Sequence, residues 1–119
     1  MIKSLQNILP QDMEPFLDNK TAIIDVRRED EWQYTGLIKG AHKLTFFDGF
    51  GNYDIDSWLK EFEKIVKSKK EKVILVCAHA NRTRTIGNFL INKLAYEDVC
   101  HLEGGMALWC EQGKEVVKP

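Results

Sequence analysis

Two short apolar runs predict buried strands, over residues 22–26 and 73–77. The second run is continuous rather than alternating, and it contains several β-branched residues. Such runs are typical of parallel strands that are covered on both faces. Weaker patterns predict a further strand over residues 98–102 and a short one near residues 43–46.

Apolar residues recur at helical spacing over residues 55–66 and 86–94. This spacing predicts two amphipathic helices, and Asp54 or Asp56 is available to cap the first of them. Shorter patterns predict helices over residues 10–17, 29–34 and 105–111. Because strands alternate with helices, we predict an α/β fold with a mostly parallel central sheet flanked by helices on both faces.

Length and charge narrow the class of protein. A chain of 119 residues is long enough for one core, so we predict a single domain over residues 1–119. The formal net charge is -1, which gives no reason to expect nucleic acid or an anionic membrane as a partner. No apolar run approaches the ~20 residues of a membrane helix. The first residues reach Pro10 and Asp12 before any long apolar stretch, unlike a secretory signal.

The cysteines indicate a reducing compartment. There are three, Cys77, Cys100 and Cys110, and no pair has Cys-x-x-Cys spacing. A disulfide framework is therefore not expected, and we predict reduced thiols in a cytoplasmic protein. No close pair of ligands has the spacing typical of a zinc site, so no metal is expected.

The clearest chemical pattern runs from the second apolar strand into the second helical stripe. A buried strand ends at Cys77, a polar loop follows, and an amphipathic helix begins. In open α/β sheets, ligands bind at the carboxyl ends of the strands. Backbone N–H groups of the loop, the positive end of the helix dipole and Arg82 are expected to stabilise a thiolate at Cys77. Since the thiolate is the nucleophilic form, Cys77 is the candidate nucleophile.

Cys77 also has a structural interpretation, as a small buried side chain that closes a strand. The residues after it argue against this interpretation, because the loop is polar and shows no apolar periodicity. Its polar residues are His79, Asn81, Arg82 and Thr83.

Three motifs resemble, in order, those of rhodanese domains. Cys77-x-x-x-x-Arg82-Thr83 resembles the active-site loop of that family. The upstream motif is Asp25-Val26-Arg27, followed by Glu31-Trp32, Gly36, Ile38 and Gly40-Ala41-His42. The downstream motif is Leu102-Glu103-Gly104-Gly105-Met106-Ala107-Leu108-Trp109. The resemblance covers roughly residues 5–117 and implies a rhodanese-like fold.

The resemblance implies a sulfurtransferase. The thiolate of Cys77 attacks the outer sulfur of a small anionic donor such as thiosulfate, and the resulting persulfide passes its sulfur to a thiol or protein acceptor. Backbone N–H groups hold the anionic sulfur, and Arg82 orients the loop or adds positive charge. Neither a metal nor an organic cofactor is implied. The expected substrate-binding residues are Ala78, His79, Ala80, Asn81 and Thr83.

Loop length separates this interpretation from a related phosphatase or arsenate reductase. Those enzymes have five residues between the cysteine and the phosphate-binding arginine, whereas four separate Cys77 from Arg82. A shorter loop suits one sulfur atom better than a tetrahedral oxyanion. The other alternative is a non-catalytic rhodanese module for binding or regulation, and the presence of Cys77 argues against it.

Two loop residues depart from the family pattern and bear on the choice of sulfur donor. Position 80 is often Gly in the family and is Ala80 here. If the backbone there is left-handed, Ala costs ~1–2 kcal/mol. Ala78 stands where the family often has a long polar residue.

Several nearby residues are expected to support the site rather than react. The resemblance implies that Asp25 and Arg27 form a structural ion-pair network near the loop, together with Glu31. His79 is a candidate base, although the helix dipole and Arg82 already favour the thiolate, so that a base is not required.

The remaining cysteines and the aromatic residues have mainly structural interpretations. Cys100 and Cys110 lie among apolar residues, so we expect buried structural thiols; the alternative is that one of them resolves the persulfide as a disulfide. The loop over residues 46–54 is expected near the site, where it is a candidate for acceptor docking. Residues expected in core or half-buried packing are Trp32, Trp58 and Trp109.

Overall fold

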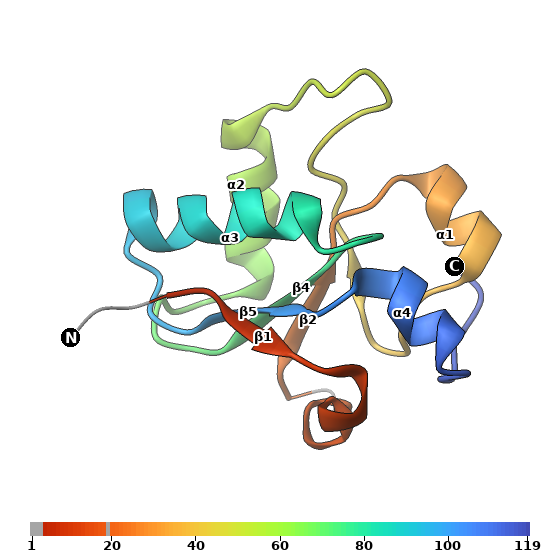
Figure 1. Cartoon of the computed structure of the whole chain (residues 1–119). Helices are drawn as coiled ribbons and strands as arrows, with labels where there is room; N and C mark the ends of the chain where they lie inside the picture. Colours follow the sequence, from red (N-terminus) through yellow and green to blue (C-terminus); the bar gives the residue numbers. More distant parts are fainter. Residues whose placement is uncertain (1–3, 19) are drawn as a thin grey trace.

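The computed structural model describes residues 4–18 and 20–119, and these form an α/β fold around one sheet (Figure 1). The sheet has five strands in the order β1-β5-β4-β2-β3, and every pair of neighbours is parallel. The predicted fold class is therefore confirmed. The strands are β1 (Gln6–Ile8), β2 (Ala22–Asp25), β3 (His42–Lys43), β4 (Val73–Val76) and β5 (Val99–Leu102).

The two apolar runs are β2 and β4, at the centre of the sheet. All four residues of β4 are buried, because the strand has a neighbour on each side and helices over both faces. β1 was not predicted. It is an edge strand in which only Ile8 is buried, so its sequence carries almost no apolar signal.

The helices follow the predicted periodicity, with one exception. They are α1 (Glu29–Thr35), α2 (Ile55–Ile65), α3 (Asn81–Leu94) and α4 (Gly105–Glu111). The helix predicted over residues 10–17 is instead two short 3-10 helices, η1 (Pro10–Asp12) and η2 (Glu14–Phe16). Pro15 lacks the N–H that a continuous α-helix needs there. In the described part of the chain, no helix is long and apolar enough to cross a bilayer.

Alternate side chains of the strands enter two cores. One core lies under α2 and α3, where Phe62 and Leu90 pack with Leu75. The other lies under α4, where Met106 and Trp109 pack with Ile74. All three tryptophans are buried, as predicted. This alternation decides which residues of β4 and β5 face the first turn of α3.

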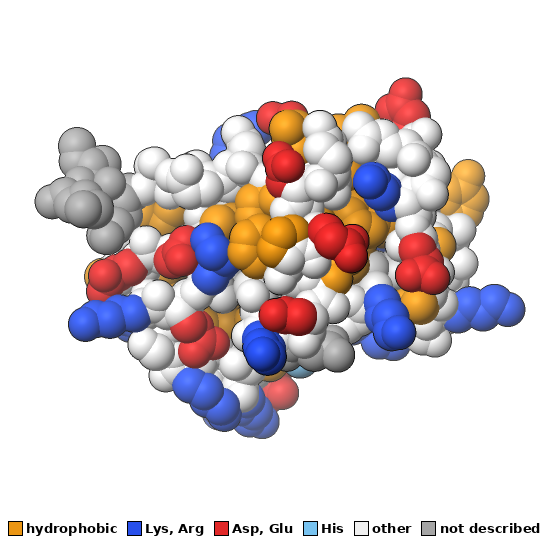
Figure 2. Space-filling view, turned by 90° about the horizontal axis from the view of Figure 1, so that it is seen from below, with side chains coloured by type: hydrophobic (Ala, Val, Ile, Leu, Met, Phe, Trp, Pro, Cys, Tyr) orange, Lys and Arg blue, Asp and Glu red, His pale blue; other side chains and the backbone are white. Residues whose placement is uncertain are grey.

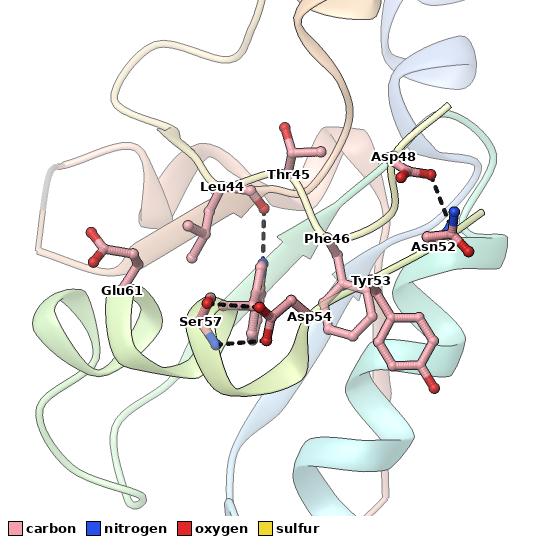
Figure 3. Close-up of a pocket in the computed structure, with 10 residues that line it drawn as sticks. Leu44, Thr45, Phe46, Asp48, Asn52, Tyr53, Asp54, Ser57 and Glu61 are labelled. Atoms are coloured by element: carbon pink, nitrogen blue, oxygen red, sulfur yellow. Dashed lines mark hydrogen bonds between the residues drawn. The ribbon is translucent and has the colours of Figure 1, made fainter. Parts of the chain in front are cut away.

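The connection from β3 to α2 forms an aromatic wall beside α3. This segment holds a cavity of about 500 Å³, lined by Phe46, Tyr53 and the first turns of α2. Figure 3 shows the residues that line it. The Phe46 and Tyr53 rings stack with centroids 5.3 Å apart. The Asp54 carboxylate caps α2 by accepting a hydrogen bond from the backbone N–H of Ser57 at 3.2 Å, as predicted.

Charged side chains of both signs are spread over the surface. The face seen from below in Figure 2 shows Lys and Arg interspersed with Asp and Glu around small apolar patches. Neither sign gathers over a large part of this face, in keeping with the net charge of -1.

Candidate active site

Cys77 lies where the central strand β4 ends and the chain turns into α3. Its side chain is 1% exposed and belongs to the core under α3, together with Ile86. Residues 77–80 form the turn between strand and helix, so the strand–loop–helix arrangement predicted from the sequence is present.

The N-terminus of α4 fixes the first two peptide groups of this loop. The backbone N–H groups of Met106 and Ala107 donate to the carbonyls of Cys77 and Ala78, at 2.8 and 3.0 Å. In a trans peptide the N–H points opposite to the carbonyl, so the N–H groups of Ala78 and His79 point away from α4. Among the described residues, no hydrogen bond outside the helices uses an N–H of residues 78–83. The loop thus offers a set of free donors.

Gly105 allows this close approach of α4 to the loop. A Cβ atom on Gly105 would lie 2.4 Å from the carbonyl oxygen of Ala78 and 2.5 Å from that of Cys77. Its φ of +60° is also one that L-residues rarely adopt. The Gly-Gly pair of the downstream motif therefore has a physical reason.

Ala80 has a left-handed backbone conformation, the case in which an alanine at this position carries an energetic cost. Its φ is 68° and its ψ is 10°, and it is the N-cap residue of α3. The left-handed region costs an L-residue about 1–2 kcal/mol, so the loop holds Ala80 against its own preference.

Arg82 reaches across to α1 and pairs with Glu31. Its Nη1 and Nη2 donate to the two carboxylate oxygens at 2.7 and 2.6 Å. These hydrogen bonds outweigh burial and raise the pKa of Arg82, to which the negative charge of Glu31 also contributes. Burial alone would raise the pKa of Glu31, but the hydrogen bonds from Arg82 and from the backbone N–H of Arg28 lower it to about 2. The guanidinium is thus held in a bidentate, charge-assisted pair.

Asp25 and Arg27 form a buried ion pair next to the loop. Arg27 Nη2 lies 2.9 Å from Asp25 Oδ2, and both side chains are 1% exposed. The remaining guanidinium protons go to the hydroxyl of Thr35 and to the carbonyls of Gly36 and Glu31. Glu31 thus joins this network through its backbone carbonyl, while its carboxylate pairs with Arg82.

Thr83 links Cys77 to a histidine that the sequence analysis did not single out. The Oγ1 of Thr83 lies 3.5 Å from Cys77 Sγ and 2.8 Å from His101 Nδ1. His101 is 2% exposed, and burial, together with the charge of Arg84, lowers its pKa. One feature of the sequence could have indicated it: His101 is a polar ring inside the otherwise apolar strand β5.

The other loop residues and cysteines divide between surface and core. His79 and Asn81 are exposed and Ala78 is half-buried. Cys100 is buried as predicted, but the prediction for Cys110 was wrong because its thiol is exposed. It directly follows Trp109, which faces the sheet, so the helical turn carries Cys110 to the outer side of α4.

A cavity of about 440 Å³ lies beside the loop, between α1 and α4. Ala78 and His79 line it from the loop, Tyr34 lines it from α1, and Cys110 lines it from α4. The cavity borders the loop that follows Cys77, although Cys77 itself does not line it. Among the described residues there is no group of three or more His, Cys, Asp or Glu placed to hold a metal.

Comparison with known proteins gives one family. Residues 9–112 match the model of the rhodanese-like domain. No curated protein matches the chain. A solved rhodanese-related protein from Thermoplasma volcanium has a TM-score of 0.71 and 23% identity, covering 96% of this chain and 99% of that one.

Two further solved structures have the same fold. A protein of unknown function from Rhodopseudomonas palustris, described as a possible tyrosine phosphatase, has a TM-score of 0.66 at 18% identity, covering 95% of this chain and 85% of that one. A thiosulfate sulfurtransferase from Pseudomonas aeruginosa has a TM-score of 0.73 at 22% identity, covering 96% of this chain and 20% of that one. These likenesses establish the fold. With nearly the whole chain matched by the family model, the protein belongs to the rhodanese-like domain family.

Proposed function

We propose that the protein is a sulfurtransferase in which Cys77 carries the transferred sulfur. The observation that supports this most directly is the position of Cys77, at the end of the central strand and before the first turn of α3, beside backbone N–H groups without protein acceptors. Such donors and the positive end of a helix stabilise an anionic sulfur. Arg82, 22% exposed and paired with Glu31, positions the loop and adds positive charge near it.

The proposed reaction has two displacements at sulfur. The Cys77 thiolate attacks the outer sulfur of thiosulfate; a sulfur–sulfur bond forms, the bond within the donor breaks, and sulfite leaves with its electron pair. An acceptor thiolate then attacks the terminal sulfur of the Cys77 persulfide and restores the Cys77 thiolate. The residues that bind the donor are Ala78, His79, Ala80, Asn81 and Thr83, chiefly through their backbone N–H groups, and no cofactor takes part. We expect the acceptor to be a small thiol or a protein in a reducing compartment such as the cytoplasm.

Mass spectrometry after incubation with thiosulfate tests this proposal. The wild-type protein should gain the mass of one sulfur atom on the peptide containing Cys77, and Cys77→Ser should gain none. A persulfide found on Cys100 or Cys110 instead would overturn the assignment. An unmodified wild-type protein with thiosulfate and with polysulfide would favour a non-catalytic rhodanese module.

The alternative function is that of a phosphatase, and an assay with an aryl phosphate tests it. Four residues separate Cys77 from Arg82, one fewer than in those enzymes. In addition, Nη1 and Nη2 of Arg82, which would have to bind a phosphate group, already donate to the Glu31 carboxylate. We expect sulfur transfer without hydrolysis of an aryl phosphate. Phosphate turnover that depends on Cys77, without sulfur transfer, would assign the protein to the rival class.

A further inference from the structure

A buried chain of three side chains leads from the candidate nucleophile into the sheet. It runs from Cys77 Sγ to Thr83 Oγ1, over 3.5 Å, and from Thr83 Oγ1 to His101 Nδ1, over 2.8 Å. The three residues are 1%, 0% and 2% exposed. His101 is not part of any of the three sequence motifs; it directly precedes the downstream motif, which begins at Leu102.

The fold places His101 under the first turn of α3. His101 pairs with Leu75 in the parallel register of β4 and β5. Since side chains alternate along a strand, Val99 and His101 face α3, while Cys100 and Leu102 face α4. A polar ring on this apolar face needs a partner, and the Thr83 hydroxyl provides one.

The Thr83 hydroxyl has one proton, so it can donate to only one of its two neighbours, and two arrangements follow in which the hydrogen bonds run in one direction along the chain. If Nδ1 of His101 carries a proton, it donates to Thr83 Oγ1, and the hydroxyl proton is left to donate to the sulfur of Cys77, a bond that is much stronger when the sulfur is a thiolate than when it is a thiol. If Nδ1 has no proton, the hydroxyl donates to Nδ1, and the thiol of Cys77 donates to Oγ1. The hydrogen on Nδ1 and the charge on sulfur are therefore coupled through Thr83.

We propose that His101 is a positioning residue that acts through Thr83, holding its hydroxyl so that it donates to the anionic sulfur of Cys77. The consequence for sulfur transfer rests on the proposed function, whereas the effect on the thiolate does not. Burial and the charge of Arg84 lower the pKa of His101, which favours a neutral ring at neutral pH. In a neutral ring one nitrogen carries the proton, so both arrangements above are available. Among the described residues, the ionisable groups connected with His101 are Cys77, through Thr83, and Arg84 on α3.

The pH profile of Cys77 alkylation tests the proposal without any sulfur donor. Iodoacetamide reacts with the thiolate, and peptide mass spectrometry separates Cys77 from Cys100 and Cys110. Because Cys77 is 1% exposed, the rate at each pH is divided by the plateau of the same variant at high pH, which removes differences in access. In His101→Leu, the profile should move to higher pH, and alkylation at neutral pH should slow about tenfold, the effect of losing one hydrogen bond to a charged group. His101→Asn can place an amide N–H near the position of Nδ1 and should restore most of the rate. His42→Asn, an exposed histidine of β3, is the matched control and should leave the profile unchanged.

A double-mutant cycle shows whether His101 acts through Thr83. Thr83→Val keeps the shape of the side chain and removes the hydroxyl, so it should shift the profile as His101→Leu does. Adding His101→Leu to Thr83→Val should then change little, because the link is already broken. Two outcomes would overturn the proposal. One is that the shifts of His101→Leu and Thr83→Val add up in the double variant; the other is that either single variant has the wild-type profile. If His101→Leu does not fold, His101→Phe replaces it in the same cycle, because it keeps a planar ring and lacks the Nδ1 donor.

The same experiments separate this inference from the proposed function. Persulfide formation in the wild type tests sulfur transfer, and alkylation tests only the thiolate. A wild type that forms no persulfide, yet shows the non-additive alkylation shifts, would refute sulfur transfer and leave the role of His101 in place. A persulfide on Cys77 with additive or absent shifts would do the reverse.

Discussion

Single residues of the site are held in states that they would not adopt alone. Ala80 has a left-handed backbone, and Glu31 keeps a largely buried negative charge. Neighbours compensate in each case: the backbone bonds from α4 fix the loop, and Arg82 supplies two hydrogen bonds to the carboxylate. Both compensations can be measured.

We predict that Ala80→Gly stabilises the protein. Glycine removes the cost of ~1–2 kcal/mol for an L-residue at this φ, while its greater freedom in the unfolded chain offsets part of the gain. The free energy of unfolding in urea should rise by about 0.5–1 kcal/mol. Ala78→Gly, in the same loop but without a positive φ, is the control and should give no gain. Equal effects of the two substitutions would show that the backbone of Ala80 is not strained.

The Glu31–Arg82 pair should make stability depend on acidity. Its hydrogen bonds lower the pKa of Glu31 from 4.5 to about 2 in the folded protein. Between these values the unfolded chain binds more protons, so the contribution is complete above pH 4.5 and is lost as the pH falls toward 2. We expect a loss of about 2 kcal/mol after allowance for solvent screening.

Urea unfolding of Glu31→Gln, at about pH 6 and about pH 3, measures this contribution. The variant should lack most of the loss seen in the wild type. Glu61→Gln breaks an exposed pair with Lys64 and should retain it, since exposed pairs contribute little. Equal pH dependence in the wild type and Glu31→Gln would contradict the assignment.

At the level of elements, two helices position a loop that belongs to neither. α4 fixes the carbonyls of residues 77 and 78, and α1 holds α3 through the pair between Glu31 and Arg82. The sequence pattern predicted the elements well, since β2 and β4 are short apolar runs and α2 and α3 have strong apolar periodicity. It did not predict which elements touch the loop, because ion pairs and backbone contacts between distant segments leave no periodic signal.

Gly105→Ala should separate α4 from the loop. The added Cβ meets two backbone carbonyls, which cannot move aside as a flexible side chain could. Overpacking and the positive φ together should lower the free energy of unfolding by about 3 kcal/mol. Persulfide formation should fall about tenfold or more, because the donors of the loop are displaced.

Gly113→Ala is the matched control for this substitution. Gly113 also has a positive φ, of +70°, but a Cβ there has open space. It should cost only the backbone term of about 1–2 kcal/mol and leave persulfide formation unchanged. If Gly105→Ala behaves like Gly113→Ala, close approach of α4 does not position the loop.

At the scale of the whole molecule, two cores on opposite faces of one sheet hold the site between them. Cys77 and His101 belong to the α3 side, and Cys100 belongs to the α4 side although it is the neighbour of His101. The sequence indicated that Cys100 is buried, but it also suggested this for Cys110, because apolar neighbours in the chain do not reveal which side of a helix a residue occupies. His101 escaped notice for a related reason: its link to Thr83 depends on how α3 lies over β5.

The cysteines therefore report on different parts of the fold. Cys110 is exposed and should react with iodoacetamide in the native protein. Cys100 is 1% exposed, and burial raises its pKa even though the nearby charge of Lys72 lowers it. The raised pKa disfavours reaction of the native protein, because the thiolate is the reactive form. Cys77 is equally buried but follows the end of β4, in the loop, whereas Cys100 lies within β5.

We predict that Cys100 becomes alkylated only as the whole sheet opens. β5 lies between β1 and β4, so exposing Cys100 requires loss of strand pairing or of the core under α4. Alkylation of Cys100 in increasing urea should follow the unfolding curve measured by circular dichroism, while alkylation of Cys110 should be complete before the transition begins. Alkylation of Cys100 at the rate of Cys110 in the absence of urea would mean that the edge of the sheet formed by β1 opens separately from the rest of the fold.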